Sequence, residues 1–208
     1  MNILIVDDHA VVRIGLKQLV EEAYPYAKVE GASTGKDALG LLDRVRWDLV
    51  ILDVNLPDQN GVELLKTMKS RHAALPVLML SLHPEEQYAL RALKAGAAAY
   101  LTKERAPEEL ATAIRQVLAG RKFITATVAE RLAAVAFSPL EQWPHERLSD
   151  REFQVLCAIG QGKTVSAIAG DMALSVKTVS TYRTRLLDKL KMRNTTELIR
   201  YTLDHALV

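Results

Sequence analysis

The sequence predicts two domains in 208 residues: an α/β doubly wound five-stranded parallel sheet, followed by a second, all-α domain of four helices. Two observations lead to this prediction. Over the first 120 residues, short apolar runs alternate five times with amphipathic stretches, which is typical of a parallel sheet covered by helices on both faces. After Gly120 no further strand pattern is convincing, and from Leu148 the apolar residues recur at helical spacing.

Each predicted strand is followed by a predicted helix. The run Ile3–Val6 indicates a buried strand, and the next helix carries one apolar stripe, made of Val12, Leu16, Leu19 and Val20. The predicted strands are 3–6, 28–32, 49–52, 76–80 and 98–101, and the predicted helices are 9–22, 34–46, 61–71, 84–95 and 107–118. In a doubly wound sheet with the order 2-1-3-4-5, the first and third strands are neighbours.

The second half of the chain is predicted to be helical. Residues 125–137 favour a helix, whereas Pro139 and Pro144 interrupt helical periodicity within 138–146 and predict a linker. The predicted domains are therefore 1–121 and 147–208. They are joined by a linker, 122–146, that contains a helix. The last domain is expected to contain helices at 149–159, 164–172, 175–190 and 195–206.

The composition excludes several classes of protein. No run reaches the ~18 apolar residues of a membrane helix, and the N-terminus lacks the basic region and cleavage site of a secretory signal. The single cysteine, Cys157, lies in an apolar helical pattern and is expected to be a buried thiol. We therefore expect a soluble cytoplasmic protein without a membrane partner.

Positive charge is concentrated near the C-terminus. Residues 1–122 carry 16 basic and 16 acidic residues, whereas the span 177–200 alone carries seven basic and two acidic residues. Such a patch suggests a polyanion site at this end of the chain. A solvated helix face is the alternative, and charge alone does not separate the two.

Acidic residues follow two strands that should be neighbours. Asp7 and Asp8 end the first strand and Asp53 ends the third, so the three carboxylates should converge at one edge of the sheet. Clustered carboxylates need a counter-charge, and Mg²⁺ is the hard cation that suits them. Ser81 and Lys103 should face the same crevice. Together with the carboxylates and the metal, these two side chains suit the binding of a dianionic phosphoryl group. The alternative for any single Asp is a helix cap or a turn.

Residues 1–120 resemble the flavodoxin-like receiver domain of bacterial two-component response regulators. The matching motifs are VDDH (6–9), LDVNLPDQNG (52–61), LSLH (80–83) and KAGAAAYLTK (94–103).

The resemblance implies a role for each acidic-site residue. Asp53 would accept a phosphoryl group from the histidine of a sensor histidine kinase, and Asn55 and His83 would tune the lifetime of the phosphoryl group. Mg²⁺ would be bound by Asp7, Asp8, Asp53 and the backbone carbonyl of Asn55. Ser81 and Tyr100 would form the switch pair, with Lys103 pairing the phosphate.

An enzyme is the first rival interpretation, because some phosphatases use an Asp nucleophile on a similar sheet. They need a second acid two residues on, where this chain has Asn55. We expect no enzymatic activity beyond phosphoryl self-transfer and slow autodephosphorylation. A second rival is a regulator that binds DNA constitutively or responds to a small ligand, and the complete acidic site argues against it.

The C-terminal segment predicts a helix-turn-helix. Ser149 and Glu152 form a candidate capping box, and Thr164 and Ser175 are candidate N-caps of two helices joined by a tight connection. The second of these helices is basic and rich in small polar residues, which suits phosphates and base edges in the major groove of DNA. An ordinary helical bundle is the alternative.

Residues 147–208 resemble the LuxR-type helix-turn-helix of NarL/FixJ-class response regulators, through LSDRE (148–152) and LSVKTVSTYRTRLLDKL (174–190). Gln154 and Gly170 depart from the usual pattern. By position, Ser180, Thr181 and Thr184 would read bases. The candidates for phosphate contacts are Lys177, Tyr182, Arg183, Arg185 and Lys189.

The same resemblance implies partners. We expect double-stranded promoter DNA, a homodimer formed on activation through the last helix, and RNA polymerase as a further partner. A symmetric dimer would read two half-sites about one turn of DNA, ~10 bp, apart.

Overall fold

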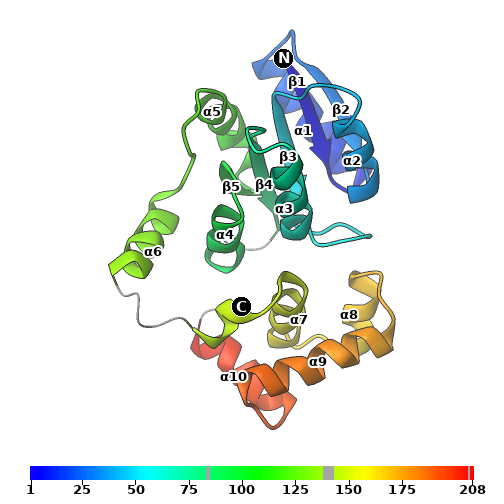
Figure 1. Ribbon diagram of the computed structural model, residues 1–208, viewed down its shortest axis with the longest axis vertical. Coiled ribbons are helices and arrows are strands. Elements are labelled where there is room, and N and C mark those ends of the chain that lie inside the picture. Colours follow the sequence, from blue (N-terminus) through cyan, green and yellow to red (C-terminus); the bar gives the residue numbers. More distant parts are fainter. Residues whose placement is uncertain (83–84, 138–142, 206) are drawn as a thin grey trace. The chain divides into compact units, whose positions relative to one another are not determined.

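Five parallel strands form the sheet in the order β2-β1-β3-β4-β5 (Figure 1). In this computed structural model the strands are Asn2–Val6 (β1), Lys28–Ala32 (β2), Leu49–Asp53 (β3), Val77–Ser81 (β4) and Ala99–Thr102 (β5). The structure describes residues 1–82, 85–137, 143–205 and 207–208. The predicted α/β doubly wound sheet and its strand order are confirmed, and β1 and β3 are neighbours in register, with Val6 opposite Leu52.

Helices cover both faces of the sheet, which is why β3 and β4 are buried at every position. The helices are Ala10–Ala23 (α1), Gly35–Leu42 (α2), Gly61–Arg71 (α3), Glu85–Lys94 (α4) and Ala106–Leu118 (α5). α1 packs against α5, whereas α3 contacts both α2 and α4. As predicted, Leu16 and Val20 of α1 are buried in the core, with Val12 and Leu19 packed against it.

The predicted helix over 34–46 is wrong at its end, because α2 stops at Leu42. The indole nitrogen of Trp47 donates a 3.1 Å hydrogen bond to the carbonyl oxygen of Leu41, which also accepts hydrogen bonds from the amides of Arg44 and Val45 just after the helix. The Trp47 ring is buried, and the chain folds back to bring it there. Val45, which would lie on the inward apolar side of a helix continuing to Arg46, is consequently exposed.

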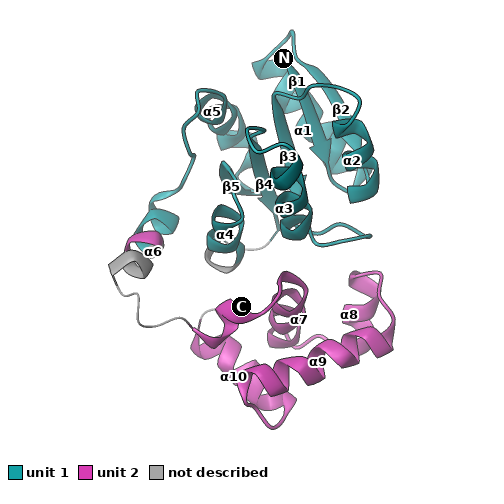
Figure 2. Ribbon diagram, in the orientation of Figure 1, with its two compact units in different colours: residues 1–130 teal, residues 131–208 magenta. Residues whose placement is uncertain are grey.

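The chain returns to the sheet after α5. The amide of Phe123 donates to the carbonyl of Ala98, forming a parallel bridge beside β5. The predicted helix over 125–137 is confirmed as Ala126–Phe137 (α6). The chain divides within this helix into units Met1–Glu130 and Arg131–Val208 (Figure 2). Residues 138–142 of the predicted linker, including Pro139, lie outside the described residues, and Pro144–Arg147 form a short 3₁₀ helix.

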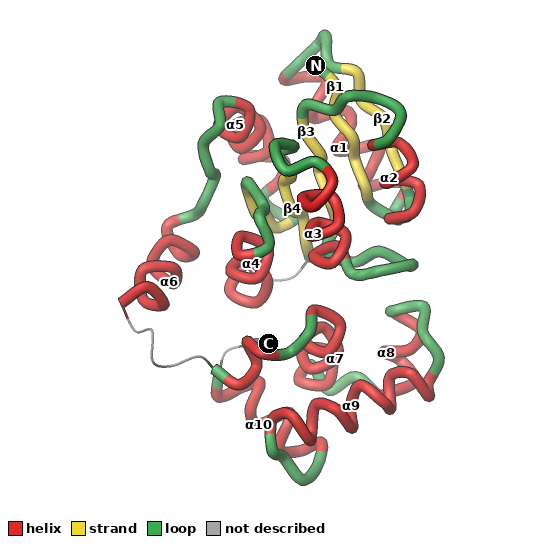
Figure 3. The backbone as a smooth tube through the Cα atoms, in the orientation of Figure 1, coloured by secondary structure: helices red, strands yellow, loops and turns green. Residues whose placement is uncertain are grey.

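The predicted all-α second domain is confirmed, and its described residues form four α-helices after the 3₁₀ turn (Figure 3). They are Asp150–Gly160 (α7), Val165–Asp171 (α8), Val176–Leu190 (α9) and Thr195–Asp204 (α10). Side chains of the residues before each helix cap the first turn, and Ser149 and Glu152 form the predicted capping box. Cys157 is a buried free thiol.

In the helix predicted over 175–190, the apolar pattern places Val176 on the inward side, and this is wrong. Val176 is 51% exposed, whereas Val179, Leu186 and Leu190 of the same helix are buried. Val176 is the first residue of α9, so its side chain points toward the helix N-terminus and beyond the packed stripe. Within the described part of the chain, no helix has the length and apolar character needed to cross a bilayer.

Candidate functional site

Four polar side chains meet at the carboxyl edge of the sheet. Asp53 is the last residue of β3, and Asp7, Asp8 and His9 directly follow β1. Each of the four offers one oxygen or nitrogen atom, and these atoms all lie within 4.8 Å of one another. The structure therefore brings together the three carboxylates that the sequence places at two strand ends, because β1 and β3 are parallel neighbours.

Lys103 supplies the counter-charge for two of these carboxylates. Its Nζ lies 2.6 Å from Oδ2 of Asp7 and donates a 2.7 Å hydrogen bond to Oδ2 of Asp53. Burial alone would lower the pKa of Lys103, but the two carboxylates outweigh burial and raise it. The ammonium is therefore held charged between the two acids.

Asp53 is a buried carboxylate with a perturbed proton affinity. Burial raises its pKa to about 6, against the opposing influence of Lys103. Asp7 adds to the increase through like-charge repulsion. An additional cation at this edge would therefore relieve an unfavourable concentration of negative charge.

The loop after β3 fixes the position of Asp53. The backbone amide of Asn55 donates a 3.2 Å hydrogen bond to Oδ1 of Asp53. Asn60 then caps α3, accepting a 2.8 Å hydrogen bond from the amide of Val62. The following residue must be glycine, because a Cβ on Gly61 would lie 2.1 Å from the carbonyl oxygen of Asp53. The sequence LPDQNG thus turns tightly back beneath the acidic residue.

His9 is a member of the cluster that the sequence reasoning did not single out. Its Nδ1 lies 2.7 Å from Oδ1 of Asp8, and its amide donates a 2.8 Å hydrogen bond to Oδ1 of Asp7. Arg13, one turn into α1, donates to the Asp7 carbonyl at 2.7 Å. The signal for His9 was its position directly after Asp8.

The donor set fits a divalent cation. Asp7 and Asp53 are buried, whereas Asp8 lies at the rim with 35% of its side chain exposed. Hard cations such as Mg²⁺ and Ca²⁺ prefer carboxylate and carbonyl oxygens and keep some water ligands. Two buried acids and one half-exposed acid provide such oxygens with access to solvent.

The predicted switch residues lie on adjacent strands. Ser81 ends β4 and is buried, and its carbonyl accepts a 2.8 Å hydrogen bond from the amide of Lys103. Tyr100 of β5 is buried and lies opposite Met79 of β4. His83, expected to tune the phosphoryl lifetime, lies outside the described residues.

A second polar cluster lies just beyond Ser81. Glu85, the first residue of α4, is buried, and its Oε1 accepts a 3.2 Å hydrogen bond from Arg105. Its Oε2 accepts a hydrogen bond from the hydroxyl of Thr125, the residue before α6. Arg105 also pairs with Glu109. These residues are widely separated in sequence, and no sequence pattern pointed to their contact.

The second unit contains the predicted helix-turn-helix. α8 and α9 are joined by a tight connection in which Ala173 adopts a left-handed conformation with φ of 51°. Along α9 the exposed side chains Lys177, Thr181, Thr184 and Arg185 share one side, opposite the buried Val179 and Leu186. Ser180 and Tyr182 are half-buried at the flanks.

Two of the basic candidates on α9 point elsewhere. Arg183 is half-buried, and its Nε is enclosed with no hydrogen-bond partner in the described part of the chain. The Nζ of Lys189 lies 2.7 Å from Oε2 of Glu152 in the capping box of α7. Burial would raise the pKa of Glu152, but hydrogen bonds from Lys189 and Ser149 outweigh it and lower the pKa. Lys189 therefore already has a partner inside its own domain.

Comparisons with known proteins match both units. Residues 3–115 match the family described as "Response regulator receiver domain", and residues 146–202 match "Bacterial regulatory proteins, luxR family". The response regulator UvrY of Escherichia coli (strain K12) is 34% identical over 208 residues, which is 100% of this chain and 95% of UvrY. The response regulator GacA of Pseudomonas aeruginosa is 34% identical over 209 residues, covering 100% of this chain and 98% of GacA.

Solved structures of RcsB resemble the chain over its whole length. RcsB from Salmonella enterica serovar Typhimurium, bound to the promoter rprA in the presence of phosphomimetic BeF₃⁻, is 24% identical with a TM-score of 0.65 and full coverage of both chains. At this identity the likeness concerns the fold. In another structure, two RcsB dimers are bound to two parallel DNAs, with 25% identity, a TM-score of 0.60 and coverage of 100% and 98%.

Proposed function

The chain belongs to the two-component response regulators that join a receiver domain to a LuxR-type DNA-binding domain, and we propose that Asp53 is its phosphoacceptor. It is accordingly a DNA-binding transcription regulator rather than an enzyme of the usual kind. One observation carries the proposal: Lys103 lies within 2.7 Å of both Asp53 and Asp7 at the open end of the sheet. A carboxylate beside a fixed cation can accept a phosphoryl group whose charge is already compensated.

The bound metal in this proposal is Mg²⁺, held by Asp7, Asp8, Asp53 and the backbone carbonyl of Asn55. When bound, it would neutralise the oxygens of the incoming phosphoryl group. The chain itself positions Asp53 through Asn55 and Lys103, and Ser81 offers a hydroxyl from the next strand. Asn55 stands where an enzyme would need a general acid, so we expect only self-transfer and slow autodephosphorylation.

The phosphoryl donor is a sensor histidine kinase. α1 begins beside the acidic cluster and presents two exposed apolar side chains, Val11 at 83% and Ile14 at 67% exposure. Exposed aliphatic residues beside a reactive carboxylate suit a transient contact with another protein. We therefore place the kinase contact on this part of α1.

The signal leaves the receiver through the elements that follow Ser81. A phosphoryl group on Asp53 would attract Ser81 and shift the packing around Tyr100, favouring one of two arrangements. Glu85 begins α4 a few residues after Ser81 and binds Thr125 at the start of α6. We propose that this contact transmits the change in packing to α6, which leads out of the receiver.

The output is binding of promoter DNA through α9. Lys177 and Arg185 are suited to phosphates, and Thr181 and Thr184 to base edges, because they share the exposed side of the helix. Ser180 lies at the flank of this surface. Tyr182, Arg183 and Lys189 are weaker candidates, since the first two are half-buried and the third is paired with Glu152.

We propose that activation produces a homodimer whose DNA-binding domains pair through α10. Leu203 of this helix is 61% exposed, whereas Leu198 and Thr202 are buried within the domain. The apolar Leu203 is thus available for a second copy. We assign 1–121 to the receiver, 122–146 to a linker with a helix and 147–208 to the DNA-binding domain. RNA polymerase is a further partner, and the bacterial cytoplasm is the compartment that such a role requires.

The phosphoacceptor assignment is tested by intact-mass spectrometry after incubation with acetyl phosphate and Mg²⁺. The wild-type chain is expected to gain one phosphoryl group, and chelation of Mg²⁺ should abolish the gain. Asp53→Asn should remain unmodified, whereas Asp58→Asn, in the same loop, should still be labelled. Full labelling of Asp53→Asn would refute the assignment.

A further inference from the structure

The edge of the sheet opposite to Asp53 carries a positively charged groove. It has a volume of about 400 Å³ and lies at the residues that precede β3, β4 and β5. Its charged lining residues are Lys69, Arg121, Lys122 and Asp48. The groove is therefore separate from the acidic cluster, which occupies the carboxyl ends of the strands.

The two lysines flank a single turn. Lys69, in the last turn of α3, donates hydrogen bonds from Nζ to the carbonyls of Ala73 and Leu75, at 2.5 and 2.9 Å. Its side chain crosses Gly96, where φ is +102° and a Cβ would lie 3.3 Å from Cγ of Lys69. Lys122 donates to the carbonyl of Ala97, the next residue of that turn. Backbone contacts on both sides thus fix the two ammonium groups.

Among the residues that the structure describes, these cations have no acidic partner. Within residues 1–82, 85–137, 143–205 and 207–208, none of Lys69, Arg121 and Lys122 forms an ion pair. Asp48 lines the groove, but its Oδ2 accepts a 2.8 Å hydrogen bond from the amide of Asn2. Burial lowers the pKa of both lysines, and the charge of Lys122 lowers that of Lys69 further. An anion in the groove would remove this repulsion.

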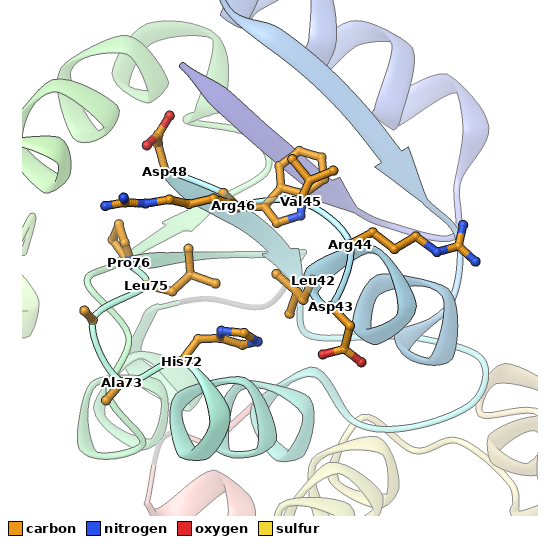
Figure 4. Close-up of a pocket in the computed structure, with 12 residues that line it drawn as sticks. Leu42, Asp43, Arg44, Val45, Arg46, Asp48, His72, Ala73, Leu75 and Pro76 are labelled. Atoms are coloured by element: carbon orange, nitrogen blue, oxygen red, sulfur yellow. The ribbon is translucent and has the colours of Figure 1, made fainter.

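A neighbouring groove provides a contrast. It has a volume of about 620 Å³, and it shares Asp48, Ala74 and Pro76 with the first groove (Figure 4). Its charged lining is balanced, with Asp43 and Asp48 against Arg44 and Arg46. Figure 4 shows Arg44 pointing away from the other lining side chains. Excess positive charge is therefore a property of the first groove and not of the whole edge.

We propose that the groove lined by Lys69, Arg121 and Lys122 binds a small multivalent oxyanion, a phosphate ester or a polycarboxylate. An ammonium has three N–H donors, so Lys69 keeps one and Lys122 keeps two for a ligand after their backbone contacts. Arg121 adds a guanidinium, which binds oxyanions through two parallel hydrogen bonds. No aromatic side chain lines the groove within the described residues, which disfavours a stacked nucleobase.

The test measures the reactivity of each lysine in the full chain. Trace acylation by an N-hydroxysuccinimide ester is quantified by mass spectrometry, with and without pyrophosphate or citrate as the probe. At about ten times the Kd of the probe, Lys69 and Lys122 should react roughly tenfold more slowly. Lys66, exposed on the same helix α3 and outside the groove, is the internal control and should be unaffected.

Arg121→Ala keeps both reporter lysines and should reduce their protection, whereas Arg115→Ala, on α5 outside the groove, should not. Protection by pyrophosphate alone would assign phosphate esters, and protection by citrate alone would assign polycarboxylates. Because the acylation rate is measured for each lysine separately, binding of a probe in this groove is distinguished from binding of phosphate by α9. The proposal would be overturned if neither probe changed the acylation rate of Lys69 or of Lys122. It would also be overturned if Arg121→Ala left their protection unchanged.

Discussion

The Nζ of Lys103 lies 2.7 Å from Oδ2 of Asp53, although the two residues are 50 positions apart. β3 and β5 are separated by β4 in the sheet, so the contact spans the ends of three strands. The contact holds the buried carboxylate of Asp53 beside the charged ammonium of Lys103. The positive charge that a phosphoryl group on Asp53 would require is therefore already in place.

The raised pKa of Asp53 predicts a pH-dependent gain in stability for Asp53→Asn. The pKa is about 6 in the folded protein against 3.8 unfolded, so the stability contributed by the protonated acid is lost as pH rises through about 6. The free energy of unfolding of the variant relative to wild type should therefore increase over this range, by up to about 3 kcal/mol at 1.36 kcal/mol per pKa unit.

The measurement is urea denaturation at several pH values without divalent cations. Unfolding is monitored by the fluorescence of Trp47 in a Trp143→Phe background. Asp37→Asn, exposed on α2, is the matched control for loss of a carboxylate. If the free energy of unfolding of Asp53→Asn relative to wild type decreased as the pH was raised from acidic to neutral, the assigned environment of Asp53 would be contradicted.

Gly61→Ala should destabilise the receiver. The added Cβ would lie 2.1 Å from the Asp53 carbonyl oxygen and 2.8 Å from Cα of Val54, and backbone atoms cannot give way as a flexible side chain can. We expect the free energy of unfolding to fall by about 1–3 kcal/mol or more. Phosphoryl incorporation should also be slower, because Asp53 is displaced. Gly40→Ala is the control and should be neutral or stabilising, because an added Cβ there would meet no described atom within 4 Å beyond the adjacent residues and the backbone of its own helix. Equal unfolding midpoints for the two variants would be inconsistent with this tight turn.

Loss of the Glu85–Thr125 contact should loosen the start of α6. A hydrogen bond to a charged group contributes about 1.5–3 kcal/mol, and Glu85 is buried, so Thr125→Val should increase hydrogen exchange of the first amides of α6. The same variant should weaken the effect of phosphorylation on DNA binding while leaving phosphoryl incorporation intact. Glu130→Gln, exposed on α6, is the control. Unchanged exchange in Thr125→Val would show that the contact does not hold α6.

Two basic residues of α9 should behave differently when neutralised. Arg185→Ala should weaken DNA binding and lower the slope of log affinity against log salt by about one, as expected for a lost phosphate contact. Lys189→Met should mainly lower the stability of the second unit, because Lys189 is the ion-pair partner of Glu152. Titrations of labelled DNA at several salt concentrations check the first effect, and thermal unfolding checks the second. If Arg185→Ala lowered mainly the stability and Lys189→Met weakened mainly DNA binding, the placement of these residues on α9 would be contradicted.

The sequence was sufficient for the parts of the structure that depend on local patterns. Alternating apolar runs predicted the strands, and Ser149, Thr164 and Ser175 predicted helix starts through local capping bonds. Asp53 and Lys103 could be placed at one edge because parallel strands end together. By contrast, the end of α2 depends on the burial of Trp47, and the Glu85–Thr125 contact joins residues 40 positions apart. Such contacts depend on tertiary packing, which leaves no periodic signal.

The central claim is that a phosphoryl group on Asp53 controls DNA binding by α9. Its most direct test is fluorescence anisotropy of promoter DNA with the full chain, after treatment with acetyl phosphate and Mg²⁺, comparing wild type with Asp53→Asn. Phosphorylated wild type should bind about 5–150-fold more tightly than the untreated protein, the usual range of coupling between two sites, and Asp53→Asn should not respond. Equal affinities of untreated wild type and wild type fully phosphorylated at Asp53 would contradict the claim.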